Sequence, residues 1–226
     1  MKHFSKAMLL VCISLCLGCA PSLIGSVSGD RYTSPRNWFS VQVPKSSNVF
    51  NVPFSVQDRT GKEDPGKNFD LVKFSVEDFG EVLIAGVDYF PDDFIESRMK
   101  QDDHRTVLSK LSHTALYFER RYPVEPKVVE ETYLETPYGE ALLRVYMAEK
   151  GSMIFSIGTK GGGAPIVRET FDTLIAVIVA RQKNNFIYGI AEHDLESNGP
   201  GGPGRNKDAL KRRAQSFFAS IAVHRN

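Results

Sequence analysis

The 226-residue sequence contains little cysteine, and all of it lies close to the N-terminus. The three cysteines are Cys12, Cys16 and Cys19, and no cysteine follows in the rest of the chain. Residues 20–226 therefore cannot form an internal disulfide, whichever compartment they occupy. The stability of this part must come from a packed core, for which about 190 residues are sufficient.

An excess of charge of one sign is also absent. Lys and Arg together number 28 and Asp and Glu 27, so the formal net charge is +1. A nearly neutral surface gives no basis for wrapping nucleic acid, and we expect no nucleic-acid partner. Hydrophobic residues make up 42% and charged residues 24% of the chain, which is typical of a globular protein and not of a disordered one.

Apolar runs long enough to cross a membrane are missing. The run at residues 7–17 has eleven residues and is interrupted only by Ser14, whereas a transmembrane helix needs about twenty. Lys2 and Lys6 precede this run and small residues follow it, a combination typical of a secretory signal. We therefore interpret residues 1–18 as a leader that is removed from the mature protein.

The end of this leader reads LCLGCA at residues 15–20 and resembles the lipobox of bacterial lipoproteins. In that family a peptidase cuts before the cysteine, which becomes the lipidated first residue. The resemblance implies acylation of Cys19, with Gly18 matching the residue before the cut. Cys16 stands where the family usually has leucine, and Leu17 stands where it has a small residue. The alternatives are an ordinary cleaved signal and an uncleaved anchor.

The number of cysteines agrees with a lipid anchor. Cys12 and Cys16 leave with the leader, so the mature chain keeps Cys19 alone and cannot use it for an internal bridge. Stable anchoring needs more than one acyl chain, and the three-chain modification of this family meets that requirement. Ala20, in place of aspartate, implies by the family's sorting rule an outer-membrane protein that faces the periplasm.

The mature chain divides into a tether and one domain. Residues 19–34 are rich in Ser and Gly and are predicted to be the lipidated cysteine and a flexible tether, which reaches at most roughly 50 Å. The alternative is a peptide that lies on the domain through Leu23, Ile24 and Val27. Residues 35–226 are predicted to form a single globular domain.

Period-two alternation of apolar residues predicts strands in the first half of this domain. The predicted strands cover residues 38–43, 50–56, 72–76 and 82–90, and a loop is predicted at 59–68. Pro53 suggests that the second of them is an edge strand. The fourth is apolar on nearly both faces and is placed near the sheet centre. Trp38 is expected to point away from the core row, where it covers a helix or forms a small partner-binding surface.

A helix is predicted to open at Asp92 and Asp93, and the polar patch at residues 100–105 can divide it. Strands are predicted next at 128–134, 141–148, 153–157, 174–180 and 186–191, and a loop at 192–205. Asn206 is a predicted N-cap for the last helix. The apolar stripes of the two helices are Leu108, Leu111, Ala115, Phe118 and Tyr122 in the first, and Leu210, Ala214, Phe217, Phe218 and Ile221 in the second.

Antiparallel strands with segregated helices indicate the α+β class, an antiparallel sheet flanked by helices. The order of elements over residues 35–223 resembles the PsbP-type α/β/α sandwich, on the strength of segments 38–44, 72–90 and 214–221. Related domains occur in a photosystem subunit, a nuclear Ran-binding factor and periplasmic lipoproteins of the DcrB type. The resemblance implies a fold and carries no activity with it.

Catalytic and metal-binding motifs are scarce, and we expect no enzyme, no cofactor and no metal. The sequence has no Gly-x-Ser-x-Gly motif and no zinc-protease histidine pair.

Residues 102–104 (Asp-Asp-His) are interpreted as a solvated helix face and His193-Asp194 as the start of a polar loop. The alternative for each is a ligand-binding or catalytic site. Residues 211–213 and 120–121 are basic clusters on helix faces, with lipid headgroups or a partner as the alternative. The glycine-rich segment 158–163 is interpreted as a flexible turn.

Three functions remain open at this point. The first is a non-catalytic lipoprotein that binds another envelope protein or stabilises an assembly. The second is a small-molecule binder with a pocket between the sheet and the helix at 92–122. The third is a hydrolase built around Glu192, His193 and Asp194.

Overall fold

The computed structural model describes residues 24–45, 53–62, 66–76, 81–92, 101–118, 122, 124–156, 167–194 and 206–224. The predictions for the leader, for Cys19, for a helix start at Asp93, and for the glycine-rich loop lie outside these residues.

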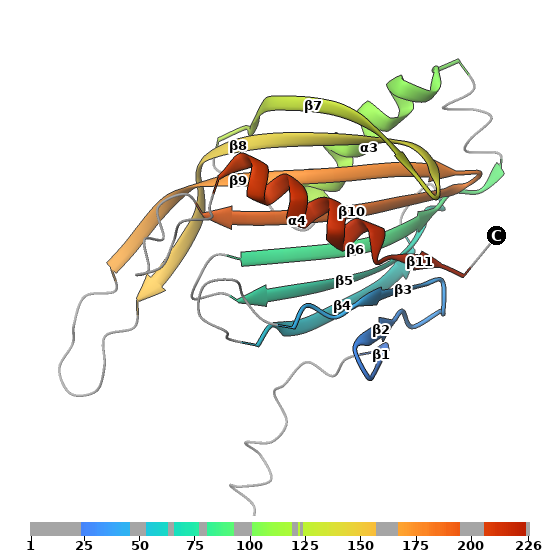
Figure 1. Cartoon of the computed structure of the whole chain (residues 1–226), viewed down its shortest axis with the longest axis horizontal. Helices are drawn as coiled ribbons and strands as arrows, with labels where there is room; N and C mark the ends of the chain where they lie inside the picture. The colour runs from blue at the N-terminus through green and yellow to red at the C-terminus, as the bar shows by residue number, and fades with distance from the viewer. Residues whose placement is uncertain are drawn as a thin grey trace, which may run out of the picture.

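A seven-stranded antiparallel sheet dominates the described chain (Figure 1). The order of its strands is β4 (Ser55–Lys62), β5 (Asn68–Val76), β6 (Glu81–Tyr89), β10 (Asn185–Asp194), β9 (Val167–Gln182), β8 (Gly139–Ser156) and β7 (Lys127–Thr136). Together with two helices, α3 (His104–Phe118) and α4 (Lys207–Ala219), the sheet confirms the α+β prediction. No helix among the described residues is long and apolar enough to cross a bilayer.

A second, smaller sheet packs beside the first. It consists of β1 (Ser26–Ser28), β2 (Arg31–Thr33), β3 (Phe39–Gln42) and β11 (Ala222–Val223), in that order. The side chains of Tyr32, Phe39 and Val41 are buried in the same core as those of α4. The small sheet therefore joins the N-terminal part of the described chain to residues that follow the last helix.

Part of the predicted tether is thus folded. The prediction of a flexible segment is wrong for residues 24–34, because Tyr32 is fully buried and pairs with Val41 across the hairpin. The alternative, a peptide docked through Ile24 and Val27, is also not what the structure shows, since these side chains are 59% and 46% exposed. The buried tyrosine, and not the aliphatic residues, holds the segment on the domain.

The main sheet is buried on both faces at its centre. In β6 the side chains of Leu83, Ala85 and Val87 belong to the core that contains α4, whereas Val82 and Ile84 belong to the core that contains α3. This follows from the alternation of side chains along a strand. The prediction that β6 lies near the sheet centre is confirmed, whereas the edge strand β4 shares only Ser55 and Val56 with the edge strand predicted at 50–56.

Several strands are longer than the sequence suggested. Arg59 to Lys62, predicted as loop, continue β4 and pair with β5 as far as Asn68. Glu192 to Asp194, also predicted as loop, continue β10, where His193 pairs with Leu174. Residues 141–148 and 153–156, predicted as two strands, belong to one strand, β8, with a register shift between Ala148 and Ser152. The backbone groups of polar residues form the same inter-strand hydrogen bonds as those of apolar residues. The pairing at polar strand ends is therefore not visible in the pattern of apolar residues.

The N-terminus of α3 lies at the end of the predicted polar patch. Asp103 accepts a hydrogen bond at Oδ1 from the Thr106 backbone N–H at 2.9 Å, which satisfies one of the free amide groups of the first turn. Leu108, Leu111 and Ala115 are buried as predicted. The helix ends at Phe118, so Tyr122 packs against the same core from beyond the helix.

The helix α4 agrees closely with the prediction. Asn206 is its N-cap and accepts from the Ala209 N–H at 2.8 Å, and all five residues of the predicted stripe are buried. Trp38 is buried, so it does not form the exposed partner-binding surface that was one of its two expected roles. Its ring lies 6.3 Å from that of Tyr89, and the guanidinium of Arg36 lies 4.9 Å above it.

Candidate functional site

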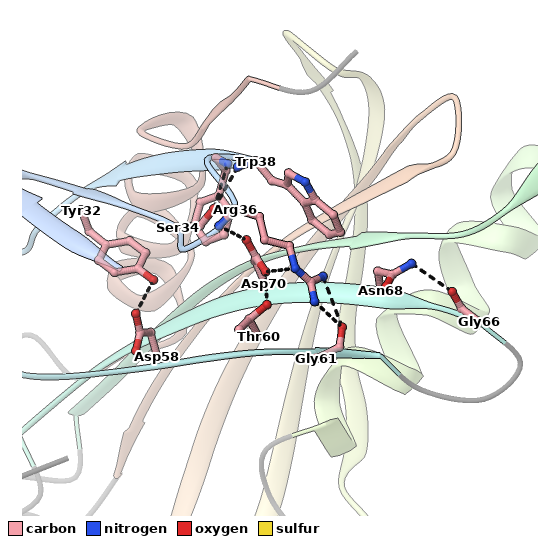
Figure 2. A network of polar contacts seen from close by, with 11 residues as sticks. Tyr32, Ser34, Arg36, Trp38, Asp58, Thr60, Gly61, Gly66, Asn68 and Asp70 are labelled. Atoms are coloured by element: carbon pink, nitrogen blue, oxygen red, sulfur yellow. Dashed lines mark hydrogen bonds and ion pairs between the residues drawn. The ribbon is translucent and has the colours of Figure 1, made fainter. Parts of the chain in front are cut away.

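Polar side chains join the small sheet to the edge of the main sheet, and Figure 2 shows this network. The residues come from β4 and β5 on one side and from β2 and the β2–β3 turn on the other. Phe54, immediately before β4, belongs to the core, and Val56 within β4 packs against it. Asp58 and Thr60 continue the same side of the strand, since side chains alternate. A charged residue therefore stands in a core-facing row.

The carboxylate of Asp58 accepts hydrogen bonds from three donors in the N-terminal segment. It accepts from the backbone N–H of Ile24 at 2.9 Å, from that of Gly25 at 2.5 Å, and from the Tyr32 hydroxyl at 2.8 Å. Hydrogen bonds to an ionised acceptor are roughly twice as strong as those between neutral groups. We call these residues (Ile24, Gly25, Tyr32 and Asp58) the Asp58 clamp, since they fix the chain to the edge strand from residue 24 onward.

Tyr32 is the buried member of the clamp. Burial raises the pKa of its hydroxyl far above the ordinary value, and the hydrogen bond to Asp58 raises it further. The hydroxyl therefore keeps its proton at neutral pH. The ring packs at 6.1 Å from Phe39 and edge-on at 6.5 Å from Phe74. One side chain thus links both sheets through its ring and its hydroxyl.

Asp70 forms the second half of the network. It is fully buried and accepts from Thr60 Oγ1 at 2.6 Å and from the Arg36 backbone N–H at 3.2 Å. The Nε atom of Arg36 lies 3.8 Å from the same carboxylate, and its two terminal nitrogens donate to the Gly61 carbonyl at 3.3 Å. Ser34 accepts from the Trp38 N–H at 3.0 Å. The turn between β2 and β3 is thereby held on β4 and β5.

We expect Asp70→Ala to destabilise the domain by about 2 kcal/mol, because it leaves the Thr60 hydroxyl and the Arg36 N–H without this acceptor in a buried place. Urea denaturation followed by circular dichroism measures the change. Asp30→Ala is the control, since Asp30 is exposed and surface changes usually stay within about 0.5 kcal/mol. Equal midpoints for the two variants would show that the network does not stabilise the fold.

The network binds part of its own chain. Both carboxylates accept donors from the N-terminal segment or its turn, and Thr60 adds a donor from the edge strand itself. Hydrogen bonds of this kind hold a segment of the chain in one position. The chemistry that the arrangement supports is therefore attachment of the N-terminal hairpin.

The Asp-Asp-His sequence at the start of α3 has structural contacts. Asp103 caps the helix, and hydrogen bonds from Thr106 lower the pKa of its carboxyl. Asp102 pairs with Lys110 at 2.7 Å. The Nε2 atom of His104 lies 3.3 Å from the Glu140 carbonyl oxygen. These three residues thus contact α3 and β8.

Glu192 and His193 lie inside β10 and are buried, not at the start of a polar loop as predicted. The Tyr122 hydroxyl donates to Glu192 at 3.1 Å, which brings the chain beyond α3 onto this strand. Within the described ranges, no group of three or more His, Cys, Asp or Glu residues is placed to hold a metal ion. Cys19, the predicted lipidation site, lies outside those ranges.

The basic cluster on α4 is largely engaged. Lys211 contacts Glu130, and Arg213 pairs with Glu81 at 2.9 Å. Arg212 lines a groove of about 520 Å³ together with Lys45 and residues of β3 and α4. This groove lies on the α4 side of the sheet, so it is not the pocket beside the first helix that the sequence suggested.

Sequence reasoning missed Asp58, Asp70 and Tyr32. One signal was available, because Asp70 precedes Val72 and Phe74 at period two and so belongs to the row that faces the core. A carboxylate in such a row needs buried partners. The sequence does not show which residues supply them, since Arg36 and Tyr32 are more than 25 positions away.

No family model matches the chain, and no curated protein matches it. The structure is similar to the solution structure of cyanobacterial PsbP (CyanoP) from Synechocystis sp. PCC 6803, with 13% identity, a TM-score of 0.47, and coverage of 89% of this chain and 99% of that one. It is also similar to a crystal structure from Bacteroides thetaiotaomicron VPI-5482, with 10% identity, a TM-score of 0.38, and coverage of 88% of this chain and 50% of that one. Neither likeness bears on activity.

Proposed function

We propose that this protein is a membrane-anchored envelope lipoprotein whose domain binds another envelope protein without catalysing a reaction. The observation that carries the proposal is the Asp58 clamp, which begins at Ile24, five residues after Cys19. An acyl group on Cys19 would be joined almost directly to the folded domain. The proposed location is the outer membrane, facing the periplasm.

A non-catalytic role is supported by what the candidate catalytic residues do. Asp103 caps α3, Asp102 pairs with Lys110, and Glu192 accepts from Tyr122. Each group is engaged in a contact that stabilises the fold. The proposal includes a domain of the PsbP/DcrB-like kind, because the segments on which that sequence resemblance rests contain β3, the β5–β6 hairpin and α4.

Cys19→Ser tests the anchor. We expect this variant to leave the membrane fraction completely, because the acyl chains account for stable attachment and serine cannot form the thioether. Fractionation followed by mass spectrometry of the mature N-terminus measures both attachment and acyl mass. Cys12→Ser, which lies outside the lipobox-like segment, is the matched control and should remain acylated at residue 19. A native N-terminus without acyl mass would contradict the proposal.

The partner requires a separate experiment. Crosslinking of the lipidated protein in its own membranes, followed by purification, should recover one specific envelope protein. The Cys19→Ser variant should lose this crosslink if the partner is reached only at the membrane surface. Repeated failure to recover a specific partner from membranes that contain the acylated protein would count against the binding role.

A further inference from the structure

The link between the proposed acyl group and the folded domain is short. Five peptide steps separate Cys19 from Ile24, and a fully extended chain spans at most about 18 Å over that number of residues. The main sheet is wider than this link, because seven strands spaced about 4.8 Å apart extend over roughly 29 Å. The edge strand β4 must therefore stay close to the bilayer, whereas β7 lies at the opposite edge.

The point where the link joins the domain is rigid. The carboxylate of Asp58 holds two consecutive backbone N–H groups, those of Ile24 and Gly25. A Cβ at Gly25 would lie 2.5 Å from the Thr33 carbonyl oxygen and 2.6 Å from the Tyr32 hydroxyl, closer than a Cβ atom comes to such neighbours in folded proteins. Only glycine permits this packing. The direction in which the chain leaves the domain is thus fixed by contacts on both of its sides.

Apolar side chains are exposed at this exit. Ile24 is 59% and Val27 46% exposed, and all three residues of β1 face solvent. Arg36, Arg59 and Lys62 are exposed cations on the adjoining turn and on β4, against the exposed carboxylate of Asp30. Aliphatic residues flanked by cations are typical of surfaces that lie in a lipid interface.

We propose that in the anchored protein the β1–β2 hairpin lies against the lipid headgroups, and that the Asp58 clamp sets this orientation. The inference rests on the proposed acylation of Cys19. The occupant of the exposed apolar surface is the bilayer that carries the acyl chains, because the link is too short to hold the hairpin elsewhere. The β7 edge then projects away from the membrane.

Two valines provide matched positions for the test. Val27 on β1 is 46% exposed and Val128 on β7 is 50% exposed, and they lie in strands at opposite sides of the structure (Figure 1). Because Cys19 is acylated and no other cysteine is left in the mature chain, Val27→Cys and Val128→Cys each introduce a single thiol. The acylated protein is labelled with a fluorophore and placed in phosphatidylcholine vesicles that contain headgroup-nitroxide lipid.

We expect the label at residue 27 to lose most of its fluorescence and the label at residue 128 to keep it, because nitroxide quenching acts only at short range. Asp58→Ala in the Val27→Cys background should restore the fluorescence while the protein stays in the membrane fraction. Thermal melting checks that this variant is folded. Insertion of ten Gly/Ser residues between Ala20 and Pro21 lengthens the link by about 35 Å without touching the domain, and it should restore the fluorescence as well.

The outcomes separate this inference from the function on which it rests. A protein that lacks acyl mass or does not bind vesicles overturns the proposed function. An acylated, vesicle-bound protein in which both labels are quenched equally overturns the orientation alone. Quenching at residue 27 that survives both Asp58→Ala and the insertion shows that the clamp does not set the orientation.

Discussion

Replacing Phe217 with aspartate should abolish the folded state. Phe217 is buried in α4, and its ring meets that of Phe74 edge-on at 6.0 Å, so the substitution places a carboxylate in the core between helix and sheet. An unpaired buried charge costs several kcal/mol, and loss of the ring adds about 3–5 kcal/mol. The sum of these two losses is comparable to the roughly 5–15 kcal/mol by which the folded state of a domain is stabilised. Thermal and urea unfolding followed by circular dichroism would measure the loss.

The neighbouring residue supplies the control for this variant. Ser216 is exposed on the same helix, and Ser216→Asp introduces the same charge one position earlier without burying it. We expect Ser216→Asp to melt close to the parent protein. An unchanged melting temperature for Phe217→Asp would mean that α4 is not docked on the sheet as described.

Glu81→Ala should be the second most damaging change. Glu81 accepts from Arg213 at 2.9 Å, and the exposed fractions of the two side chains are 3% and 18%. Its removal leaves the guanidinium, which also lies 5.7 Å above the Phe54 ring, without its counter-charge. A buried pair that loses one partner costs about 3–5 kcal/mol, and the partial exposure of Arg213 places the expected value near 3 kcal/mol. Urea denaturation measures this change in the free energy of unfolding.

Two comparisons isolate the charge effect. The double variant Glu81→Leu with Arg213→Met should recover most of the lost stability, because apolar residues of similar volume often replace buried pairs without cost. Lys127→Ala breaks a pair with Glu149 that is exposed on both sides, and it should leave the unfolding midpoint within error. A loss for Glu81→Ala no larger than that for Lys127→Ala would argue against an important role of the pair.

Local patterns explain why much of the main sheet and α4 could be predicted. The residues of β6 are apolar on both faces because the strand is covered on both sides, so the sequence shows an uninterrupted run. Asn206 and the apolar stripe that ends in Phe217 and Phe218 belong to one helix. The N-cap and the helical spacing of apolar residues can be recognised there from residues close together in the sequence.

Pairing over long distances explains what could not be predicted. The β1–β2 hairpin offers one buried aromatic, Tyr32, among Ser, Gly and charged residues, and it forms because β3 and Asp58 are nearby in space. Asp58 itself lies between the strand predicted at 50–56 and the loop predicted at 59–68. Its role depends on two backbone N–H groups more than 30 residues earlier. The alternation of apolar residues along a strand gives no information about a contact at that distance.

The pairing of β3 with β11 has a consequence for the order of events during folding. Ser40 pairs with Ala222, and Phe39 with Val223, so β3 lacks this neighbour until residues 222–223 have reached it. Contacts of such high sequence separation form slowly. Closure of the small sheet thus brings together two segments that lie more than 180 residues apart in the sequence.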